Sequence, residues 1–185
     1  MQDTNKKHIF LTGFMGAGKS RIGKLLAKRF ACSFFDSDKL IEEEAGVSIK
    51  EIFETKGEDY FRSVETKSIQ KLCNLKKRAI IALGGGANIN PANSEMIQAN
   101  GISVYIKSAP QAIFERVRHS DKRPLLKIEQ GENFEQRLLE RINSLLIERN
   151  PVYEKSDIVF VRDGLELDEI VEKLFYHIQE FRDNN

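Results

Sequence analysis

The stretch GFMGAGKS, residues 13–20, decides the fold expected for this chain. It matches in full the glycine-rich loop that wraps around nucleotide phosphates, in which backbone N–H groups point inward at phosphate oxygens. The apolar run HIFLT, residues 8–12, precedes the stretch, and apolar residues at helical spacing follow it from Lys19 to Phe30. This order of strand, loop and helix predicts a phosphate site at a helix start, where the helix dipole also favours an anion.

Two side chains of this loop have separate expected tasks. Lys19 is expected to place its ammonium group on the β- and γ-phosphates, and Ser20 to place its hydroxyl on a bound Mg²⁺. The loop alone does not separate a kinase from an ATP-driven switch. A GTP-binding switch protein usually carries an Asn-Lys-x-Asp guanine-reading motif, and this sequence has none.

Length and charge exclude several other classes of protein. The 185 residues suffice for one domain with a hydrophobic core, and the formal net charge of +1 gives no basic field for nucleic acid. No apolar run approaches the roughly 18 residues of a membrane span, and the N-terminal run is too short for a signal peptide. Cys32 and Cys73 lack metal-ligand spacing, so two free thiols are expected, with one disulfide as the alternative. We therefore expect a cytoplasmic monomer without membrane or nucleic-acid partners.

Short apolar runs alternate with amphipathic segments along the whole chain. The pattern predicts strands over residues 8–12, 32–36, 79–83, 102–106 and 157–161. It predicts helices over residues 19–30, 38–46, 58–75, 91–99, 110–118, 132–149 and 167–178, the sixth of them ended by Asn150-Pro151. Such alternation is typical of an α/β three-layer sandwich, with a five-stranded parallel sheet flanked by helices in a single domain. Ligands of these sheets bind beyond the carboxyl ends of the strands.

The stretch DSD, residues 36–38, places two carboxylates directly after the second predicted strand. In an extended segment, residues i and i+2 point to the same side, so Asp36 and Asp38 would both face the cleft and Ser37 would face away. A Mg²⁺ ion would relieve their repulsion, and phosphoryl transfer needs one carboxylate near the metal and another near the acceptor hydroxyl. The alternative is that Asp38 merely caps the helix that follows.

Other polar features carry less information when each is taken alone. Three successive glycines after the third strand cost conformational entropy, so something is expected to approach the backbone closely there. The polar loop HSDKRPLLKIEQG, residues 119–131, is long enough to be a lid that brings Arg123 to the transferring phosphate, although a surface arginine is an equal alternative. Arg62 and Arg149 lie in helical segments, where most arginines are solvated.

Taken together, the motifs resemble those of the shikimate kinase family over nearly the whole chain. The matching stretches are GFMGAGKS, DSD, GEDYFRSVE at residues 57–65, LGGGA at 83–87, RPLL at 123–126 and RNPVYEK at 149–155. The resemblance implies a P-loop enzyme with a nucleoside-monophosphate-kinase-like fold and a mobile lid. It implies transfer of the γ-phosphate of ATP to the 3-hydroxyl of shikimate, with Mg²⁺, on the pathway to chorismate and aromatic amino acids.

The resemblance also implies roles for individual residues. Lys19, Asp38 and Arg123 would be catalytic, with Asp38 on the shikimate hydroxyls, and Ser20 and Asp36 would serve Mg²⁺, Asp36 through water. Shikimate would bind in the region 36–62 and beyond, with its carboxylate between Arg62 and Arg149. The glycines lining its pocket would be Gly84, Gly85 and Gly86. The residues implied for ATP are Gly16, Ala17, Gly18, Lys19, Ser20, Arg21, Arg116, Arg123 and Arg162.

Two other functions remain open from the sequence. A kinase of another small polyol acid, such as gluconate, would use the same scaffold, because fold does not determine function. An ATP-dependent regulator that keeps the phosphate loop without catalysis is the second, although the retained Asp36, Asp38 and Arg123 argue against it. The chain departs from the family after the fifth strand, where VRDGLELDE offers Arg162 and no proline for the adenine.

Overall fold

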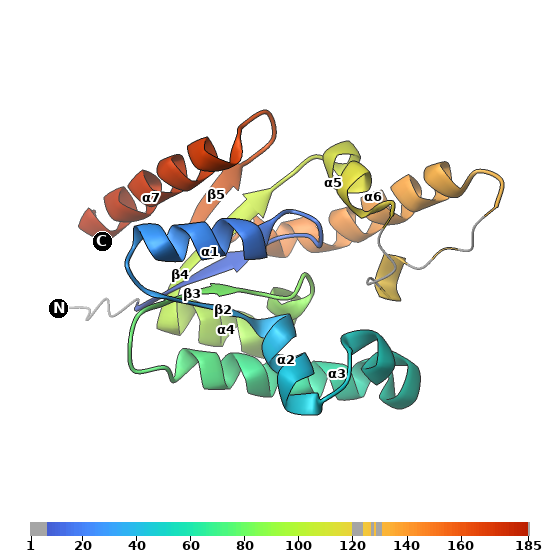
Figure 1. Cartoon of the computed structure of the whole chain (residues 1–185), viewed down its shortest axis with the longest axis horizontal. Helices are drawn as coiled ribbons and strands as arrows, with labels where there is room; N and C mark the ends of the chain where they lie inside the picture. The colour runs from blue at the N-terminus through green and yellow to red at the C-terminus, as the bar shows by residue number, and fades with distance from the viewer. Residues whose placement is uncertain (1–6, 120–123, 127, 129–130, 185) are drawn as a thin grey trace.

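The computed structural model describes residues 7–119, 124–126, 128 and 131–184. Its helices and strands alternate along the chain, as the apolar pattern predicts (Figure 1). The strands are β1 His8–Thr12, β2 Ser33–Asp36, β3 Ala79–Ala82, β4 Gly101–Lys107 and β5 Ile158–Val161. The α-helices are α1 Lys19–Arg29, α2 Ser37–Ala45, α3 Ile49–Cys73, α4 Pro91–Asn100, α5 Pro110–Val117, α6 Phe134–Tyr153 and α7 Leu167–Asp183. Two short 3₁₀ turns, Ala87–Ile89 and Pro124–Leu126, complete the described elements.

The five strands form one parallel sheet in the order β2-β3-β1-β4-β5. The predicted fold class is therefore confirmed. The central strand β1 is buried along its whole length, which explains why HIFLT is a continuous apolar run rather than an alternating one. Because all strands run the same way, their carboxyl ends meet at one edge, and the phosphate loop leaves from the middle of that edge.

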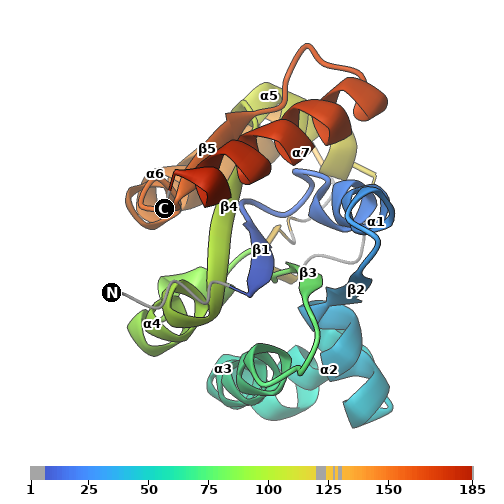
Figure 2. The ribbon, with the colours of Figure 1, turned by 90° about the vertical axis from the view of Figure 1, so that its left-hand side faces the viewer.

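Helices α1 and α7 cover one face of the sheet (Figure 2). Ile22 and Leu26 of α1 and Ile170 and Leu174 of α7 are fully buried against this face. The amphipathic spacing of both helices places these side chains on one stripe, and burying an aliphatic side chain of this size stabilises the fold by about 1.5–3 kcal/mol. This layer fixes α1, and with it the phosphate loop, on the sheet.

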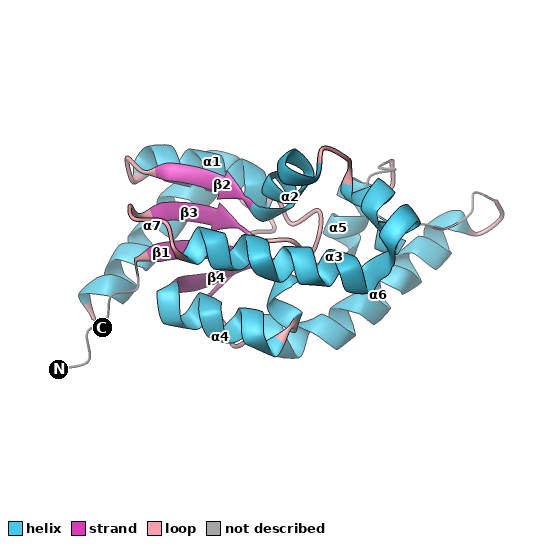
Figure 3. Cartoon of the chain, turned by 90° about the horizontal axis from the view of Figure 1, so that it is seen from below, coloured by secondary structure: helices cyan, strands magenta, loops and turns pink. Residues whose placement is uncertain are grey.

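Helices α3, α4 and α6 cover the opposite face (Figure 3). Phe10 and Ile81 of the sheet pack there against Ile69 of α3 and Ile97 of α4. A neighbouring cluster joins Tyr105 of β4 to α5 and α6. These helices carry several of the predicted site residues, so the packing of this layer sets the shape of the candidate site.

Two predicted helix boundaries differ from those of the structure. Helix α6 does not end at Asn150-Pro151 but continues to Tyr153, with exposed Pro151 inside its last turn. The extra turn is held because Tyr105 Oη donates to Asn150 Oδ1 at 2.9 Å and Tyr153 is fully buried. The prediction for α3 is incomplete at its start: the helix expected from about Glu58 is present, but helical turns from Ile49 precede it across a break at Gly57, where φ is 79°.

Both cysteines are free thiols, as expected. Burial raises the pKa of the Cys73 thiol to about 11, so it is an unreactive part of the core. Among the described residues, no helix is both long enough and apolar enough to cross a membrane.

Candidate active site

The phosphate loop joins β1 to α1 with a backbone that glycine makes possible. Gly13, Gly16 and Gly18 have φ angles of 131°, 82° and 90°, a region that residues with a side chain rarely adopt. Helix α1 has no acidic residue in its first turn, and no described side chain caps it. Its first N–H groups and its dipole therefore face the loop unopposed, which favours an anion at this point.

Lys19 is the first residue of α1 and is nearly buried, with 8% of its surface exposed. Its Nζ donates to the carbonyl oxygens of Gly13 and Phe14 at 2.6 and 3.0 Å. The ammonium group thus lies inside the curve of the loop, where phosphate oxygens would compete for it. Phe14 packs beneath the loop against the α5 and α6 cluster.

Asp36 ends β2 and caps α2, which corrects the prediction for DSD. Helix α2 begins at Ser37, so the segment is not extended, and the capping residue is Asp36 rather than Asp38. One carboxylate oxygen of Asp36 accepts from the backbone N–H groups of Asp38 and Lys39, at 3.1 and 3.3 Å. The other accepts from Ser20 Oγ at 2.5 Å, which ties β2 to the phosphate loop. These hydrogen bonds hold the side chain of Asp36 in the predicted cleft.

Ser37 and Asp38 leave the first turn of α2 in different directions. Ser37 is fully buried, and its Oγ accepts from the backbone N–H of Gly84 at 2.9 Å. Asp38 instead lines the cavity described below, together with Asp36. The two carboxylates therefore share one cleft with Ser37 turned away, as predicted. The reason differs from the prediction, because helical geometry rather than strand alternation gives the two carboxylates this arrangement.

The three glycines after β3 are required for close approach and not for an unusual backbone. A Cβ atom on Gly84 would lie 2.5 Å from Asp38 Oδ1, and one on Gly86 would lie 2.8 Å from Arg62 Nη1. A Cβ on Gly85 would lie 3.1 Å from the backbone nitrogen of Met15 in the phosphate loop. The glycines therefore let Asp38, Arg62 and the phosphate loop converge on one short stretch of backbone.

Arg62 is held by two carboxylates on its own helix. Its Nη1 donates to Glu65 Oε2 and its Nη2 to Glu58 Oε1, both at 2.9 Å. Glu65 is 1% exposed, and burial raises the pKa of its carboxyl, an effect that Arg62 opposes and Asp38 reinforces. The side chain of Arg62 stays 25% exposed, so one side of its guanidinium faces the cavity that it lines.

Arg149 approaches the same glycines from α6. It is 5% exposed, and its Nη1 donates to the carbonyl of Gly85 at 3.2 Å. The hydroxyl of Tyr153 donates to the same carbonyl, and burial raises the pKa of Tyr153 to about 12. The Nε of Arg149 is buried and donates to no acceptor among the described residues.

A cavity of about 990 Å³ connects these groups. It reaches from Ser20 and Asp36 on the phosphate-loop side to Arg62 on α3, and the apolar rings of Phe53 and Phe61 form part of its wall. Arg149 does not line it directly and lies behind Gly85. Such a volume and mixed lining suit a small polar molecule beside a nucleotide.

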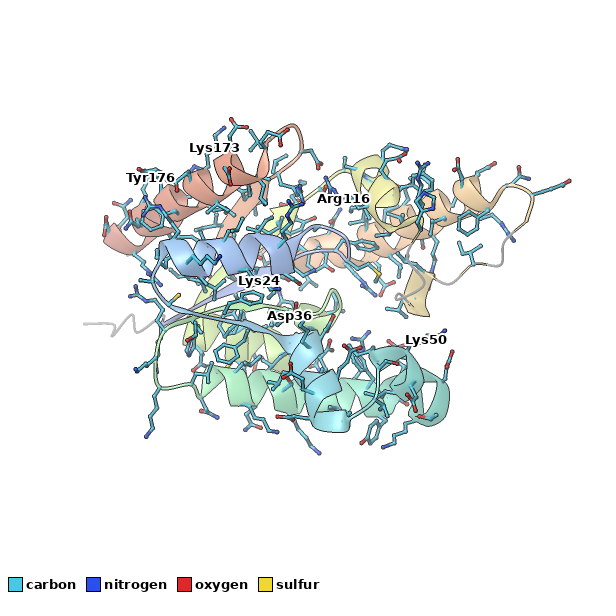
Figure 4. The ribbon with its side chains drawn as sticks, in the orientation of Figure 1. Lys24, Asp36, Lys50, Arg116, Lys173 and Tyr176 are labelled. Carbon is cyan, nitrogen blue, oxygen red and sulfur yellow. The ribbon has the colours of Figure 1, made fainter. Side chains whose placement is uncertain are left out.

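Arg116 and Arg162, two more of the predicted nucleotide residues, lie on the other side of the phosphate loop (Figure 4). Arg116 on α5 and Asp36 at the start of α2 lie on either side of the loop (Figure 4). Arg162, directly after β5, donates from Nη1 to the carbonyl of Ala17 at 2.9 Å. Arg21 is exposed on the outer face of α1 and does not line the cavity. Arg123 and much of the predicted lid, residues 119–131, lie outside the described residues.

Sequence reasoning missed Glu65 as a member of this site. It lies in the stretch GEDYFRSVE, three residues after Arg62 and four after the buried Phe61. A carboxylate on the buried face of a helix and within one turn of an arginine was the available signal. The pairing explains why Arg62 is not one of the many solvated helix arginines.

The oxygen donors at the end of β2 fit Mg²⁺. Ser20 Oγ and a carboxylate oxygen of Asp36 lie together beside the phosphate loop, and Mg²⁺ is commonly held by one or two carboxylates together with substrate phosphates. No group of three or more His, Cys, Asp or Glu residues suited to a metal occurs in the described part of the chain.

Comparison with known proteins places these features in a family. The family model described as shikimate kinase matches residues 15–179. A shikimate kinase from Thermodesulfovibrio yellowstonii is 40% identical over 168 residues, which cover 91% of this chain and 92% of that protein. The solved shikimate kinase from Acinetobacter baumannii in complex with shikimate has a TM-score of 0.86 and 32% identity. The matched region covers 94% of this chain and 93% of the Acinetobacter chain.

A kinase of another polyol acid shares only the fold. A gluconokinase from Sinorhizobium meliloti has a TM-score of 0.58 and 14% identity, with 97% of this chain and 95% of that one covered. The similarity to shikimate kinases extends instead to sequence over nearly all of the chain. The matched residues 15–179 span most of the phosphate loop, the glycines after β3 and the helices that carry Arg62 and Arg149. The chain belongs to the shikimate kinase family.

Proposed function

We propose that this protein transfers the γ-phosphate of ATP to the 3-hydroxyl of shikimate, giving shikimate 3-phosphate and ADP. The observation that carries the proposal is the single cavity that reaches from Met15 and Ser20 of the phosphate loop to Asp38 and the Arg62–Glu65 pair. The membership of the family and the shikimate-bound Acinetobacter structure support this choice of acceptor.

The nucleotide half of the site is the phosphate loop with the start of α1. Backbone N–H groups from Gly16 to Ser20 would bind phosphate oxygens, and Lys19 would exchange its carbonyl partners for the β- and γ-phosphates. Mg²⁺ would be held by Ser20, with Asp36 acting through water, and when bound it neutralises charge on the β- and γ-phosphate oxygens. Asp36 also accepts a hydrogen bond from the Ser20 hydroxyl at 2.5 Å, which orients that hydroxyl.

The acceptor half matches a small polyol that carries one carboxylate. Guanidinium groups bind carboxylates through paired N–H donors, which suits Arg62 on the cavity wall. Arg149 would join it once its side chain moves out from behind Gly85, to whose carbonyl it now donates. Glu65 orients Arg62, because its buried carboxylate accepts from one Nη while the side of the guanidinium toward the cavity stays available. The hydroxyls of the substrate would meet Asp38, whose carboxylate can only accept hydrogen bonds.

Transfer requires the 3-hydroxyl oxygen to form a bond to the γ-phosphorus as the bond from that phosphorus to the β,γ-bridging oxygen breaks. Asp38 is the carboxylate on the acceptor side that can receive the hydroxyl proton, while the bridging electron pair leaves with ADP. Closure of the predicted lid, residues 119–131 with Arg123, would keep water from accepting the phosphate instead.

The test is a coupled ADP-release assay with ATP and Mg²⁺, run against shikimate, gluconate and nucleoside monophosphates. We expect turnover with shikimate alone. Turnover with gluconate and none with shikimate would show that the acceptor is wrong. No turnover with any acceptor, together with normal ADP binding, would point to a regulator that binds nucleotide without catalysis.

A further inference from the structure

The turn after β5 connects both sides of the nucleotide site through two adjacent residues. Arg162 donates to the carbonyl of Ala17 in the phosphate loop, and its guanidinium lies where a Cβ on Gly18 would be only 2.4 Å from Nη1. The next residue, Asp163, bonds instead to the start of α5. Two neighbouring side chains thus contact the phosphate loop on one side and the start of α5 on the other.

Asp163 accepts hydrogen bonds from three groups at the α5 side. Ser108 Oγ and the backbone N–H of Ala109 each donate to it at 2.5 Å, and Arg116 Nη2 donates at 3.3 Å. Burial by itself raises the pKa of the Asp163 carboxyl, but these hydrogen bonds outweigh it and leave the pKa below its ordinary value. Asp163 is therefore a charged carboxylate at neutral pH, surrounded by donors.

Arg116 has two anchors and both belong to this group. Besides Asp163, its Nη1 donates to Ser108 Oγ at 2.9 Å, and Ser108 is itself bonded to Asp163. The three side chains form a closed triangle, which we call the Ser108–Arg116–Asp163 triangle. Arg116 keeps 32% of its side chain exposed, so the held guanidinium still presents a free surface.

The surroundings of the triangle are strongly cationic. Burial lowers the pKa of Arg162, and the nearby charges of Arg116 and Arg21 lower it further, while Asp163 acts in the opposite direction. Asp163 is thus a negative charge placed among arginines at the edge of a site meant for an anionic nucleotide. A carboxylate there repels ATP through its field, so its presence requires a compensating benefit.

We propose that Asp163 is a positioning residue of the nucleotide site, which holds Arg116 against Ser108 in the orientation that contacts the base of ATP. The inference rests on the proposed function and on the ATP-binding role that the family resemblance implies for Arg116. Asp163 does not touch the nucleotide, and the loss of its charge has two opposite consequences. The weaker repulsion strengthens ATP binding, whereas the released Arg116 weakens it.

The sign of the effect in Asp163→Asn decides between these consequences, because asparagine keeps the shape and removes the charge. In the full-length protein we expect the KM for ATP and the dissociation constant for ADP, measured by calorimetry, to rise about three- to fivefold. The KM for shikimate should stay unchanged. Tighter nucleotide binding would overturn the proposal, because it would mean that Asp163 acts only by repelling ATP. Unchanged binding would overturn it too, because Asp163 would then have no effect on the nucleotide site.

A double mutant tests whether Asp163 acts through Arg116. In an Arg116→Ala background, Asp163→Asn should change ADP binding by less than twofold, because the group that it positions is gone. A full three- to fivefold loss in that background would refute the positioning role. Ser108→Ala, which keeps the carboxylate and removes the other anchor, should weaken ADP binding in the same direction, and it serves if Asp163→Asn does not fold.

Asp157 provides a matched control at the other end of β5. Like Asp163 it accepts from a serine hydroxyl and a backbone N–H, and for Asp157 both belong to Ser103 of β4, at 2.8 Å. Asp157→Asn should lower the melting temperature without changing ADP binding, and an equal loss of binding would mean that general destabilisation is the cause. ADP binding can be measured without an acceptor substrate. A wild-type protein that binds ADP but does not phosphorylate shikimate would therefore refute the proposed function without refuting the positioning role of Asp163.

Discussion

Gly84→Ala is the most direct test of how this site is built. The added Cβ would lie 2.5 Å from Asp38 Oδ1 and 3.0 Å from Glu65 Oε1, while ordinary contacts of a Cβ begin at 3.4 Å. The φ angle of Gly84 is not in the left-handed region, so the substitution strains no backbone torsion. Its whole effect comes from the methyl group meeting the two carboxylates.

The required movement can be worked out from these distances. Asp38 Oδ1 must retreat by 3.4 minus 2.5, or 0.9 Å, unless the strand end moves instead. The strand end is held, because the Gly84 N–H donates to the buried Ser37 Oγ at 2.9 Å. A displacement of about 1 Å in a group that orients the reacting atoms costs roughly 100-fold in rate.

We therefore expect kcat for shikimate phosphorylation to fall about 100-fold in Gly84→Ala, with ADP binding within twofold of the wild type. Gly23→Ala is the matched control. Its Cβ would meet Phe34 Cε2 at the same 2.5 Å, but in the core between α1 and the sheet. That variant should lose thermal stability and keep kcat, as measured by melting curves and the coupled assay.

The reasoning fails if Gly84→Ala keeps kcat within a factor of two while folded. That result would mean that Asp38 is not held where the backbone of Gly84 constrains it. A loss of ADP binding as large as the loss of kcat would equally contradict it, because the clash lies on the acceptor side.

Three further changes probe other parts of the molecule. Arg62→Ala should raise the KM for shikimate roughly 10- to 100-fold and that for ATP far less, because one charged carboxylate contact is lost; equal rises would count against that contact in the kinetic assay. Asp38→Asn should lower kcat at least about 100-fold with ADP binding intact, and near-normal turnover would show that Asp38 has no catalytic role. His8 is fully enclosed and burial lowers its pKa, so the unfolded state binds the proton more readily. The contribution of His8 to the free energy of unfolding should therefore be fully present above the unfolded pKa of about 6.5 and should be lost as the pH falls below it. Urea titrations at several pH values should find this pH dependence reduced in His8→Leu.

Much of the fold and of the site could be predicted from local pattern. A buried five-residue strand, the phosphate loop and an amphipathic helix are each encoded within a few turns of chain, so β1, the loop and α1 were recognisable together. Alternation of such segments was enough for a parallel sheet. The close approach at the three glycines could also be predicted, because a plain turn does not require three successive glycines.

Other features depend on contacts that no local window contains. The burial of Ser37 in the first turn of α2 depends on its hydrogen bond with Gly84, and the bond from Ser20 to Asp36 joins β2 to the phosphate loop. The extension of α6 past Pro151 follows from the burial of Tyr153, which outweighs the missing N–H of one proline.

Sequence pattern thus determined which segments are strands and helices and which loops carry chemistry, because side-chain periodicity and glycine conformations are properties of short stretches. Only tertiary structure decided which of those loops meet. The order β2-β3-β1-β4-β5 brings Asp36, Gly84 and the phosphate loop to neighbouring strand ends, with Arg162 and Asp163 on the far side. That order is set by how α1, α3, α6 and α7 bury their apolar faces on the sheet, a free energy summed over the whole chain.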